Sequence, residues 1–266
     1  MQQLAVIGNP IEHSKSPEIH HAFAEQLGLA VNYRKILGDL EGFEQQVRDF
    51  FADGGVGMNV TVPFKQRAFD MCDKLSKRAE QAGAVNTLMM GKNGELYGDN
   101  TDGAGMVRDI VKVLEQPLKD KRILVIGAGG AVRGVLGPVM AQNPDIVVIA
   151  NRTVAKAEEL AQLFNCDYSS FDDLKGPFDI IINGSSASLG GELPPLKDSL
   201  VNDKTWVYDM VYGAEPTVFM QWAFARGAQG ADGLGMLVGQ AAEAFFMWLH
   251  QRPAQAPVIE KLRAEM

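Results

Sequence analysis

The stretch Arg122-Ile-Leu-Val-Ile-Gly-Ala-Gly-Gly-Ala131 decides the fold, because it joins a buried-strand pattern directly to a glycine-rich loop. Ile123–Ile126 is a continuous apolar run, which is typical of a parallel strand covered on both faces. The three glycines allow a tight turn and let a ligand approach the backbone closely. The helical pattern that follows would offer free N–H groups to a pyrophosphate. We therefore expect a dinucleotide-binding unit to begin near residue 122.

Strand and helix patterns alternate on both sides of this loop. From residue 122 onward they predict a Rossmann-like, doubly wound parallel sheet. The expected elements are Ile123–Ile126, Ala131–Gln142, Ile146–Ala150, Val154–Phe164, Phe178–Ile182 and Trp206–Met210. About a hundred residues precede the loop, and they predict an N-terminal α/β domain with its own core. We place one domain at residues 1–102, completed by C-terminal helices in 235–266, and the Rossmann-like domain at residues 103–234.

Three local expectations accompany this division. We expect a helix over Pro17–Leu27 with Ser16 as its N-cap, because serine is a preferred capping residue and proline suits the first helical turn. We expect residues 64–82 to be helical throughout. A connecting helix is expected over Asp102–Leu114.

The composition excludes several classes of protein. The formal net charge of −8 over 266 residues argues against general attraction to nucleic acid or to an anionic membrane surface. Cys72 and Cys166 are too few for a disulfide framework and lie in no metal-ligand pattern. We see no signal-peptide pattern and no apolar run long enough to span a membrane. The simplest expectation is a cytoplasmic protein.

The end of the second Rossmann strand indicates which dinucleotide binds. Asn151-Arg152-Thr153 stands where NAD enzymes commonly carry an acidic residue against the ribose. Arg152 could pair with a 2′-phosphate bidentately, with Thr153 and Lys156 adding a hydroxyl and a second cation. This favours NADP over NAD. The alternative is purely structural: Val132 departs from the usual third glycine of the loop, Arg152 ends a strand, and Thr153 caps a helix.

Polar motifs in the first domain suggest a site for a small anion. Ser14-Lys15-Ser16-Pro17 opens a helix, and two serines flanking a lysine there suit a carboxylate, although Ser16 alone is explained by capping. His13, His20 and His21 lack the further spacing that a metal site needs, so we expect no metal.

Further polar residues stand where strands end. They lie in Asn59-Val-Thr61-Val-Pro63-Phe64-Lys65, in Asn86-Thr87 and in Gly98-Asp-Asn-Thr-Asp102-Gly103. Open α/β sheets bind ligands at such an edge. Gln240 interrupts an apolar helix and needs hydrogen-bond partners, which a substrate hydroxyl or a backbone group could supply.

Together these motifs resemble the shikimate dehydrogenase family, in its NADP-dependent biosynthetic branch. The resemblance also includes Gly83-Ala-Val-Asn86-Thr87 and Asp232-Gly-Leu-Gly-Met-Leu-Val-Gly-Gln240, and it spans nearly the whole chain. It implies reversible, NADPH-dependent reduction of 3-dehydroshikimate to shikimate, on the route to aromatic amino acids. Residues 1–102 would then bind substrate, and residues 103–234 would bind NADP.

The resemblance also implies roles for individual residues. Lys65 and Asp102 would form the catalytic pair. The substrate would be bound by Ser14 and Ser16 at its carboxylate, with help from Tyr212, and by Thr61, Asn86, Asp102 and Gln240 around the ring. NADP would be bound by Gly127, Ala128, Gly129, Gly130, Ala131, Asn151, Arg152, Thr153 and Lys156, with Met210 and Gly233 near the nicotinamide. Two departures stand out: Lys156 replaces a more usual arginine, and Asn183-Gly184-Ser185-Ser186-Ala187 replaces a more usual Asn-(Ala/Thr)-(Thr/Ser) loop.

Three other interpretations remain open at this point. One is the broader quinate/shikimate branch, which often accepts NAD. Another is a catalytically silent binding module of the same pathway, and a third is a different two-domain NADP enzyme such as a methylene-tetrahydrofolate dehydrogenase. The retained Lys65–Asp102 pair and the serine pair argue against the last two. The sequence is compatible with a monomer or a homodimer.

Overall fold

The computed structural model describes all residues, 1–266, and the chain folds as two compact units. The first unit contains residues 1–105 and 238–261, and the second contains residues 106–237 and 262–266. The expected divisions after residues 102 and 234 therefore lie three residues from those of the structure. The last five residues group with the second unit, although we expected all of 235–266 to complete the first. Helices α5 (Asp102–Arg108) and α9 (Leu234–Leu249) carry the chain between the units.

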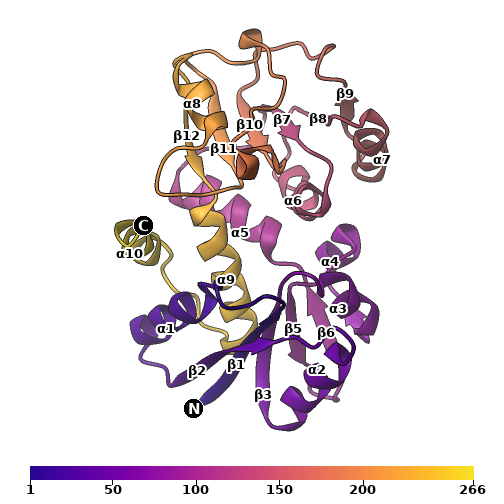
Figure 1. Ribbon diagram of the computed structural model, residues 1–266, viewed down its shortest axis with the longest axis vertical. Helices are drawn as coiled ribbons and strands as arrows, with labels where there is room; N and C mark the ends of the chain where they lie inside the picture. The colour runs from indigo at the N-terminus through magenta and orange to yellow at the C-terminus, as the bar shows by residue number, and fades with distance from the viewer. The chain divides into compact units, whose positions relative to one another are not determined.

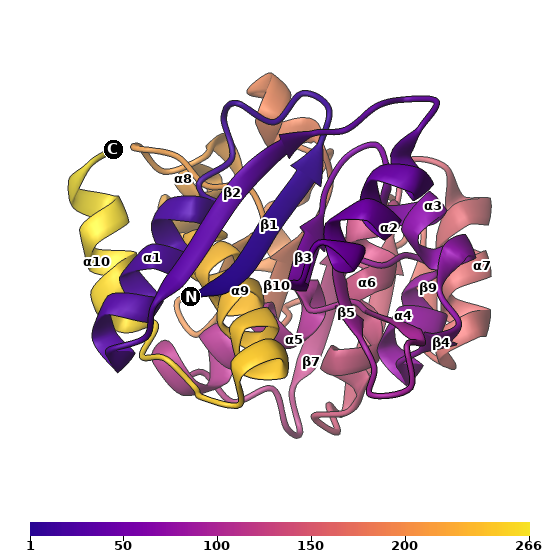
Figure 2. The same cartoon turned by 90° about the horizontal axis from the view of Figure 1, so that it is seen from below.

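The first unit is built on a mixed six-stranded sheet of order β2-β1-β3-β5-β6-β4. Strands β1, β2 and β3 run parallel, and β5 and β6 form an antiparallel hairpin. Figure 2 shows β2, β1 and β3 running alongside one another. The strands are β1 (Gln2–Gly8), β2 (Val31–Leu37), β3 (Gly55–Val60), β4 (Lys74–Leu75), β5 (Thr87–Met90) and β6 (Leu96–Asp99). The helices are α1 (Ser16–Leu27), α2 (Phe43–Ala52), α3 (Lys65–Met71), α4 (Lys77–Ala82) and α10 (Ala256–Ala264), whose last residues belong to the second unit.

Alternating side chains of β1 enter two different cores, as the two-residue period of a strand requires. Ala5 and Ile7 pack on one face of the sheet with side chains of α2 and α3. Leu4 and Val6 pack on the other face, where Trp248 of α9 lies. Both faces of this sheet are therefore covered, and its polar residues are left at the strand ends.

Two expectations for the first unit are wrong in detail. Helix α1 begins at Ser16 with Lys15 in the N-cap position, one residue earlier than expected, and the Lys15 side chain makes no capping hydrogen bond. Residues 64–82 do not form one helix, because Asp73 pairs with Leu96: its N–H donates to the Leu96 carbonyl at 2.9 Å, and its side chain accepts from the Leu96 N–H at 2.7 Å. Strand β4 results, and Ser76 then caps α4 by accepting from the Ala79 N–H.

The second unit has the strand order of a Rossmann fold. Its six strands lie in the order β12-β11-β10-β7-β8-β9, and every neighbouring pair is parallel (Figure 1). This confirms the doubly wound parallel sheet. The strands are β7 (Arg122–Ile126), β8 (Ile146–Ala150), β9 (Asp167–Ser169), β10 (Ile180–Asn183), β11 (Trp206–Asp209) and β12 (Gln229–Asp232). The helices are α6 (Gly130–Met140), α7 (Val154–Phe164) and α8 (Val218–Phe224), with two short 3-10 turns at Ala187–Gly190 and Asp198–Leu200.

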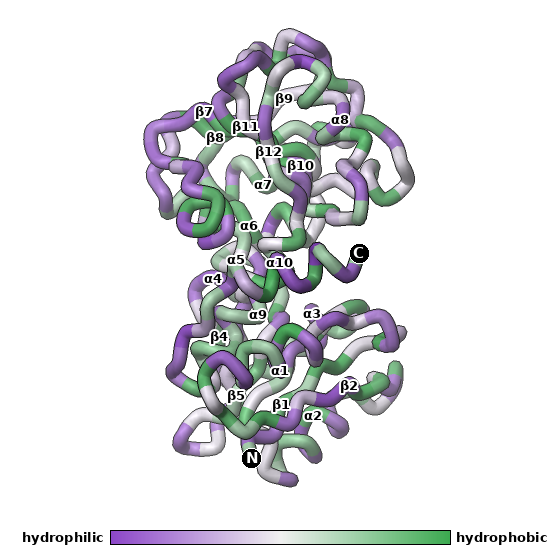
Figure 3. Tube along the Cα trace, turned by 90° about the vertical axis from the view of Figure 1, so that its left-hand side faces the viewer, coloured by the Kyte–Doolittle hydropathy of each residue, from purple (hydrophilic) through white to green (hydrophobic).

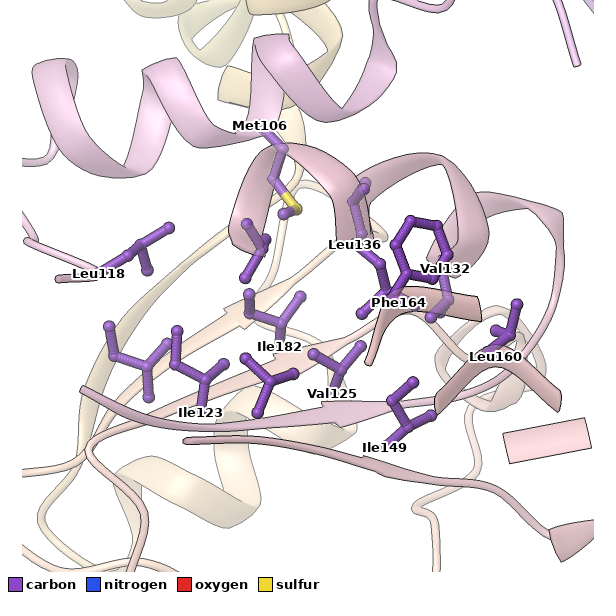
Figure 4. Close-up of a cluster of buried hydrophobic side chains, with 14 of the residues drawn as sticks. Met106, Leu118, Ile123, Val125, Val132, Leu136, Ile149, Leu160, Phe164 and Ile182 are labelled. Atoms are coloured by element: carbon purple, nitrogen blue, oxygen red, sulfur yellow. The ribbon is translucent and has the colours of Figure 1, made fainter. Parts of the chain in front are cut away.

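Helices cover both faces of this sheet. Ile123 and Val125 of β7 point toward side chains of α6 and α7, as Figure 4 shows for Val132, Leu136 and Phe164. Leu124 and Ile126 pack on the opposite face with α8. The fully apolar β7 is explained by this two-sided burial. The connecting helix is α-helical only to Arg108 and continues as a π-helical turn over Asp109–Val113.

Hydrophilic segments interrupt the hydrophobic ones along the whole chain (Figure 3). None of the helices is both long enough and apolar enough to cross a bilayer.

Candidate active site

Lys65 and Asp102 form a direct ion pair in the first unit, although 37 positions separate them in the sequence. Lys65 opens α3 and Asp102 opens α5. The Lys65 Nζ lies 2.6 Å from the Asp102 Oδ2, and the side chains are 32% and 19% exposed. A half-buried ammonium that still reaches solvent can donate a proton and then recover one.

Asn86 fixes the other oxygen of Asp102. Its Nδ2 donates to Asp102 Oδ1 at 2.7 Å and to Thr101 Oγ1 at 3.0 Å. Its Oδ1 accepts from the Thr101 N–H at 2.9 Å and from the Thr87 hydroxyl at 2.8 Å. The amide is 2% exposed, and these bonds determine which way it faces. Both Asp102 oxygens are therefore held, and the carboxylate is aimed at Lys65.

A buried chain of polar side chains joins this pair to the serine motif. Asn59 of β3 donates to the Asn86 carbonyl and to the Thr87 hydroxyl, each at 3.2 Å, and accepts from the Tyr33 hydroxyl at 2.7 Å. The Ser16 side chain lies beside that hydroxyl. Burial raises the pKa of Tyr33 well above its usual value, and Ser16 opposes the rise. Tyr33 therefore remains a neutral hydrogen-bond donor.

The other expected substrate residues lie in different surroundings. Ser14 accepts from the Ser16 N–H at 3.3 Å and lines a cavity of about 400 Å³ together with His13 and Lys35. Thr61 follows β3 and lies against Gly8 at the end of β1. Gln240 packs against Gly105 of α5, because a Cβ at Gly105 would lie 2.2 Å from the Gln240 backbone nitrogen. Gly105 is about one helical turn from Asp102.

Tyr212 belongs to the second unit, where it follows β11 and is 39% exposed.

The second unit contains a cavity of about 600 Å³ at the carboxyl ends of its strands. It is lined by all of the glycine loop from Gly127 to Ala131, by Asn151 and Arg152 after β8, and by Gly184–Ala187 after β10. Ligands of open parallel sheets bind at this edge. Of the expected cofactor residues, Thr153, Lys156, Met210 and Gly233 do not line this cavity.

The glycine loop is shaped to receive a bulky phosphate group. Gly127 has φ +106°, and a Cβ there would lie 3.1 Å from the backbone of Gly184 and Ser185. Gly129 and Gly130 face open space at the start of α6, so the first N–H groups of that helix are accessible. Val132 at the third fingerprint position is fully buried against the core. These residues fit a dinucleotide pyrophosphate.

Arg152 supplies an exposed cation to the same cavity, and no carboxylate follows β8. The Asn151 side-chain amide donates to the Thr153 carbonyl at 2.9 Å. Thr153 occupies the N-cap position of α7 but its side chain makes no capping bond. Met210 lies next to the cavity wall, because its Sδ would be 2.8 Å from a Cβ at Gly184, and Gly233 packs on the Met210 carbonyl.

Asn59, Tyr33 and Thr87 lie in the same hydrogen-bond network as Asn86, although none of them is among the site residues expected from the sequence. Asn59 and Thr87 stand in the polar motifs Asn59–Lys65 and Asn86-Thr87, so their position at a polar strand end is a local signal in the sequence. Tyr33 has no local signal, because only the pairing of β1 with both β2 and β3 brings it to Asn59.

Comparison with known proteins identifies the family. Three family models match: the shikimate dehydrogenase substrate binding domain over residues 6–88, shikimate/quinate 5-dehydrogenase over residues 109–190, and the shikimate 5′-dehydrogenase C-terminal domain over residues 233–263. A shikimate dehydrogenase (NADP(+)) from Alkalilimnicola ehrlichii is 58% identical over 266 residues, 98% of each chain.

Solved structures agree with this assignment. An Ael1 enzyme from Pseudomonas putida has a TM-score of 0.94 at 44% identity, with 98% of each chain covered. A shikimate 5-dehydrogenase from Thermus thermophilus, in complex with NADP(H) and shikimate, has a TM-score of 0.89 at 31% identity over the full length of both chains. The chain belongs to the NADP-dependent shikimate dehydrogenase family.

Proposed function

We propose that Lys65 and Asp102 catalyse the NADPH-dependent, reversible reduction of 3-dehydroshikimate to shikimate. The observation that carries this proposal is the ion pair itself: the Lys65 ammonium lies 2.6 Å from a carboxylate whose second oxygen is held by Asn86. A ketone reduction needs a cation and a proton at the carbonyl oxygen, and this arrangement supplies both from one group.

NADPH, when bound, supplies the hydride. Negative charge then develops on the carbonyl oxygen, and the Lys65 ammonium is the group that stabilises it and donates a proton from Nζ. Asp102 holds that ammonium in position through the 2.6 Å ion pair between the Lys65 Nζ and the Asp102 Oδ2. In the oxidative direction Lys65 accepts the proton of the substrate hydroxyl.

Other residues would hold the carboxylate and the ring hydroxyls of the substrate. Ser14 and Ser16, at the start of α1, would hold the substrate carboxylate with help from Tyr212, since hydroxyls and a helix N-terminus both favour an anion. Thr61, Asn86 and Gln240 would hold the ring hydroxyls.

The cofactor would be held in the second unit. The loop from Gly127 to Ala131 would bind the pyrophosphate at the start of α6. Arg152, with Asn151, Thr153 and Lys156, would bind the adenosine end and its 2′-phosphate, while Met210 and Gly233 would lie near the nicotinamide.

Replacing the lysine tests the proposal. We expect Lys65→Ala to lower kcat by about 100- to 10,000-fold, the usual contribution of general acid–base catalysis, while the dissociation constant for shikimate changes little. Lys74→Ala is the matched control, because Lys74 forms a 2.8 Å ion pair with Glu95 in the same unit and should leave kcat unchanged. Turnover of Lys65→Ala within a few fold of the unsubstituted protein would remove Lys65 from the catalytic role.

We also propose a cytoplasmic location and a monomeric or homodimeric state. In support, Cys72 and Cys166 are free thiols, and burial raises their pKa values to about 12 and about 11, so both remain protonated. Cell fractionation and sedimentation analysis would test the two statements separately.

A further inference from the structure

Asp209 is a fully buried carboxylate that receives hydrogen bonds from four donors and has no cation beside it. It ends β11 in the second unit. Its Oδ1 accepts from Asn183 Nδ2 at 3.2 Å and from the Val211 N–H at 3.1 Å. Its Oδ2 accepts from the Ser188 hydroxyl at 2.7 Å and from the Thr217 hydroxyl at 2.6 Å. A buried carboxylate is stable only with such a set of donors, and an apolar side chain could fill the same space without them. This arrangement indicates that Asp209 has a role besides packing.

The charge on Asp209 determines the orientation of the Asn183 amide. A carboxylate can only accept, so Asn183 must present its NH₂ group to Asp209. Its Oδ1 then faces the other way, where it accepts both the Ser185 N–H at 3.1 Å and the Ser185 hydroxyl at 2.8 Å. A reversed amide would place its NH₂ against two donors and break both bonds. The orientation of one buried amide therefore fixes the conformation of the loop after β10.

That loop forms a wall of the cofactor cavity. Gly184, Ser185 and Ser186 line the cavity opposite the glycine loop. The two walls approach closely, because a Cβ at Gly127 would lie 3.1 Å from both the Gly184 carbonyl oxygen and the Ser185 nitrogen. A change in the position of Ser185 therefore changes the space left beside the glycine loop.

We infer that Asp209 is a positioning residue for NADP binding, which acts through the Asn183 amide to hold Ser185 and the cavity wall. The inference rests on the proposed NADP site in this cavity. In the Asn183-Gly184-Ser185 sequence of this loop, Ser185 supplies two donors that one oriented amide oxygen receives.

The test compares Asp209→Asn with Asp173→Asn in the full-length protein. Asp173 is an exposed carboxylate of the same unit that accepts from the Ser170 hydroxyl at 2.7 Å, so it controls for the loss of a serine–carboxylate bond. Calorimetry should show that Asp209→Asn weakens NADP binding about tenfold or more and leaves shikimate binding within twofold. The Ser185 amide should also exchange its hydrogen faster. Asp173→Asn should change none of these.

A second, milder variant keeps the inference testable if Asp209→Asn does not fold. Ser185→Ala should weaken NADP binding about threefold or more. In a double-mutant cycle its effect should not add to that of Asp209→Asn, because both changes break the same connection. Asp209→Asn binding NADP as tightly as the unsubstituted protein, or additive effects in the cycle, would overturn the inference. Failure of the unsubstituted protein to bind NADP would instead overturn the proposed function.

Discussion

His20 gives the first unit a stability that depends on pH. Its side chain is fully buried, stacks on Tyr33 with ring centroids 4.2 Å apart, and is surrounded by Phe245 and Trp248. Neither ring nitrogen has a hydrogen-bond partner. Burial lowers the pKa of His20 from 6.5 to about 3, and the Asn59 side chain opposes this shift only in part. The folded protein therefore holds His20 neutral in an apolar, aromatic site.

The sign and size of the effect follow from linkage. Below pH 6.5 the unfolded chain binds a proton at His20 that the folded chain does not bind. The contribution of His20 to stability is therefore fully present above pH 6.5 and is lost as the pH falls toward 3. At pH 5 the titration of His20 therefore lowers the free energy of unfolding by about 2 kcal/mol relative to neutral pH, because each pKa unit corresponds to about 1.4 kcal/mol. The full difference, reached near pH 3, is about 5 kcal/mol.

The assay is urea unfolding of the unsubstituted protein and His20→Phe at several values between pH 5 and pH 8. Phenylalanine preserves the aromatic packing but cannot titrate, so any overpacking shifts stability equally at every pH. The variant should gain about 2 kcal/mol relative to the unsubstituted protein between pH 8 and pH 5. Phe43→Leu, a core change on the other face of the sheet, should give a constant difference. A constant difference for His20→Phe as well would refute the reasoning.

Two further predictions concern the second unit. Arg152→Ala should lower kcat/KM for NADP by about 10- to 100-fold and leave that for NAD nearly unchanged, because a lost charge-assisted pair with a phosphate is worth about 1.5–3 kcal/mol; equal losses with both cofactors would contradict this. Burial raises the pKa of Asp109 to about 6, although the hydrogen bond from the Tyr208 hydroxyl opposes the rise. The contribution of Asp109 to stability is therefore fully present below pH 3.8 and is lost as the pH rises through 6. Calorimetric melting curves should therefore show Asp109→Asn gaining stability relative to the unsubstituted protein, by up to about 3 kcal/mol, between pH 4 and pH 8; parallel curves would count against it.

Periodicity in the sequence predicts the second unit well, because its elements are determined by local patterns. The expected strand Ile146–Ala150 and helix Val154–Phe164 have the bounds that the structure shows. The break in residues 64–82 could not be predicted in this way. It depends on the pairing of Asp73 with Leu96, and no local pattern predicts a partner 23 residues away.

In the candidate site, too, some residues have a local sequence signal and others do not. Lys65, Asn86 and Asp102 stand at strand-to-helix transitions, which is a local signal, and the structure joins them by direct hydrogen bonds. Tyr33 and His20 have no such signal. Tyr33 lies on a strand and His20 on a helix, and they come together only because the sheet and α9 bury both of them.

One assay of the purified protein tests the whole proposal: initial rates of cofactor reduction at 340 nm with shikimate or quinate as substrate, and with NADP or NAD as cofactor. We expect shikimate with NADP to give the highest kcat/KM, and Arg152 predicts that NAD is used far less efficiently. Comparable rates with NAD, or preference for quinate, would contradict the proposed cofactor and substrate. No reduction with any of the four pairs would contradict the assignment of Lys65 and Asp102 as a catalytic pair.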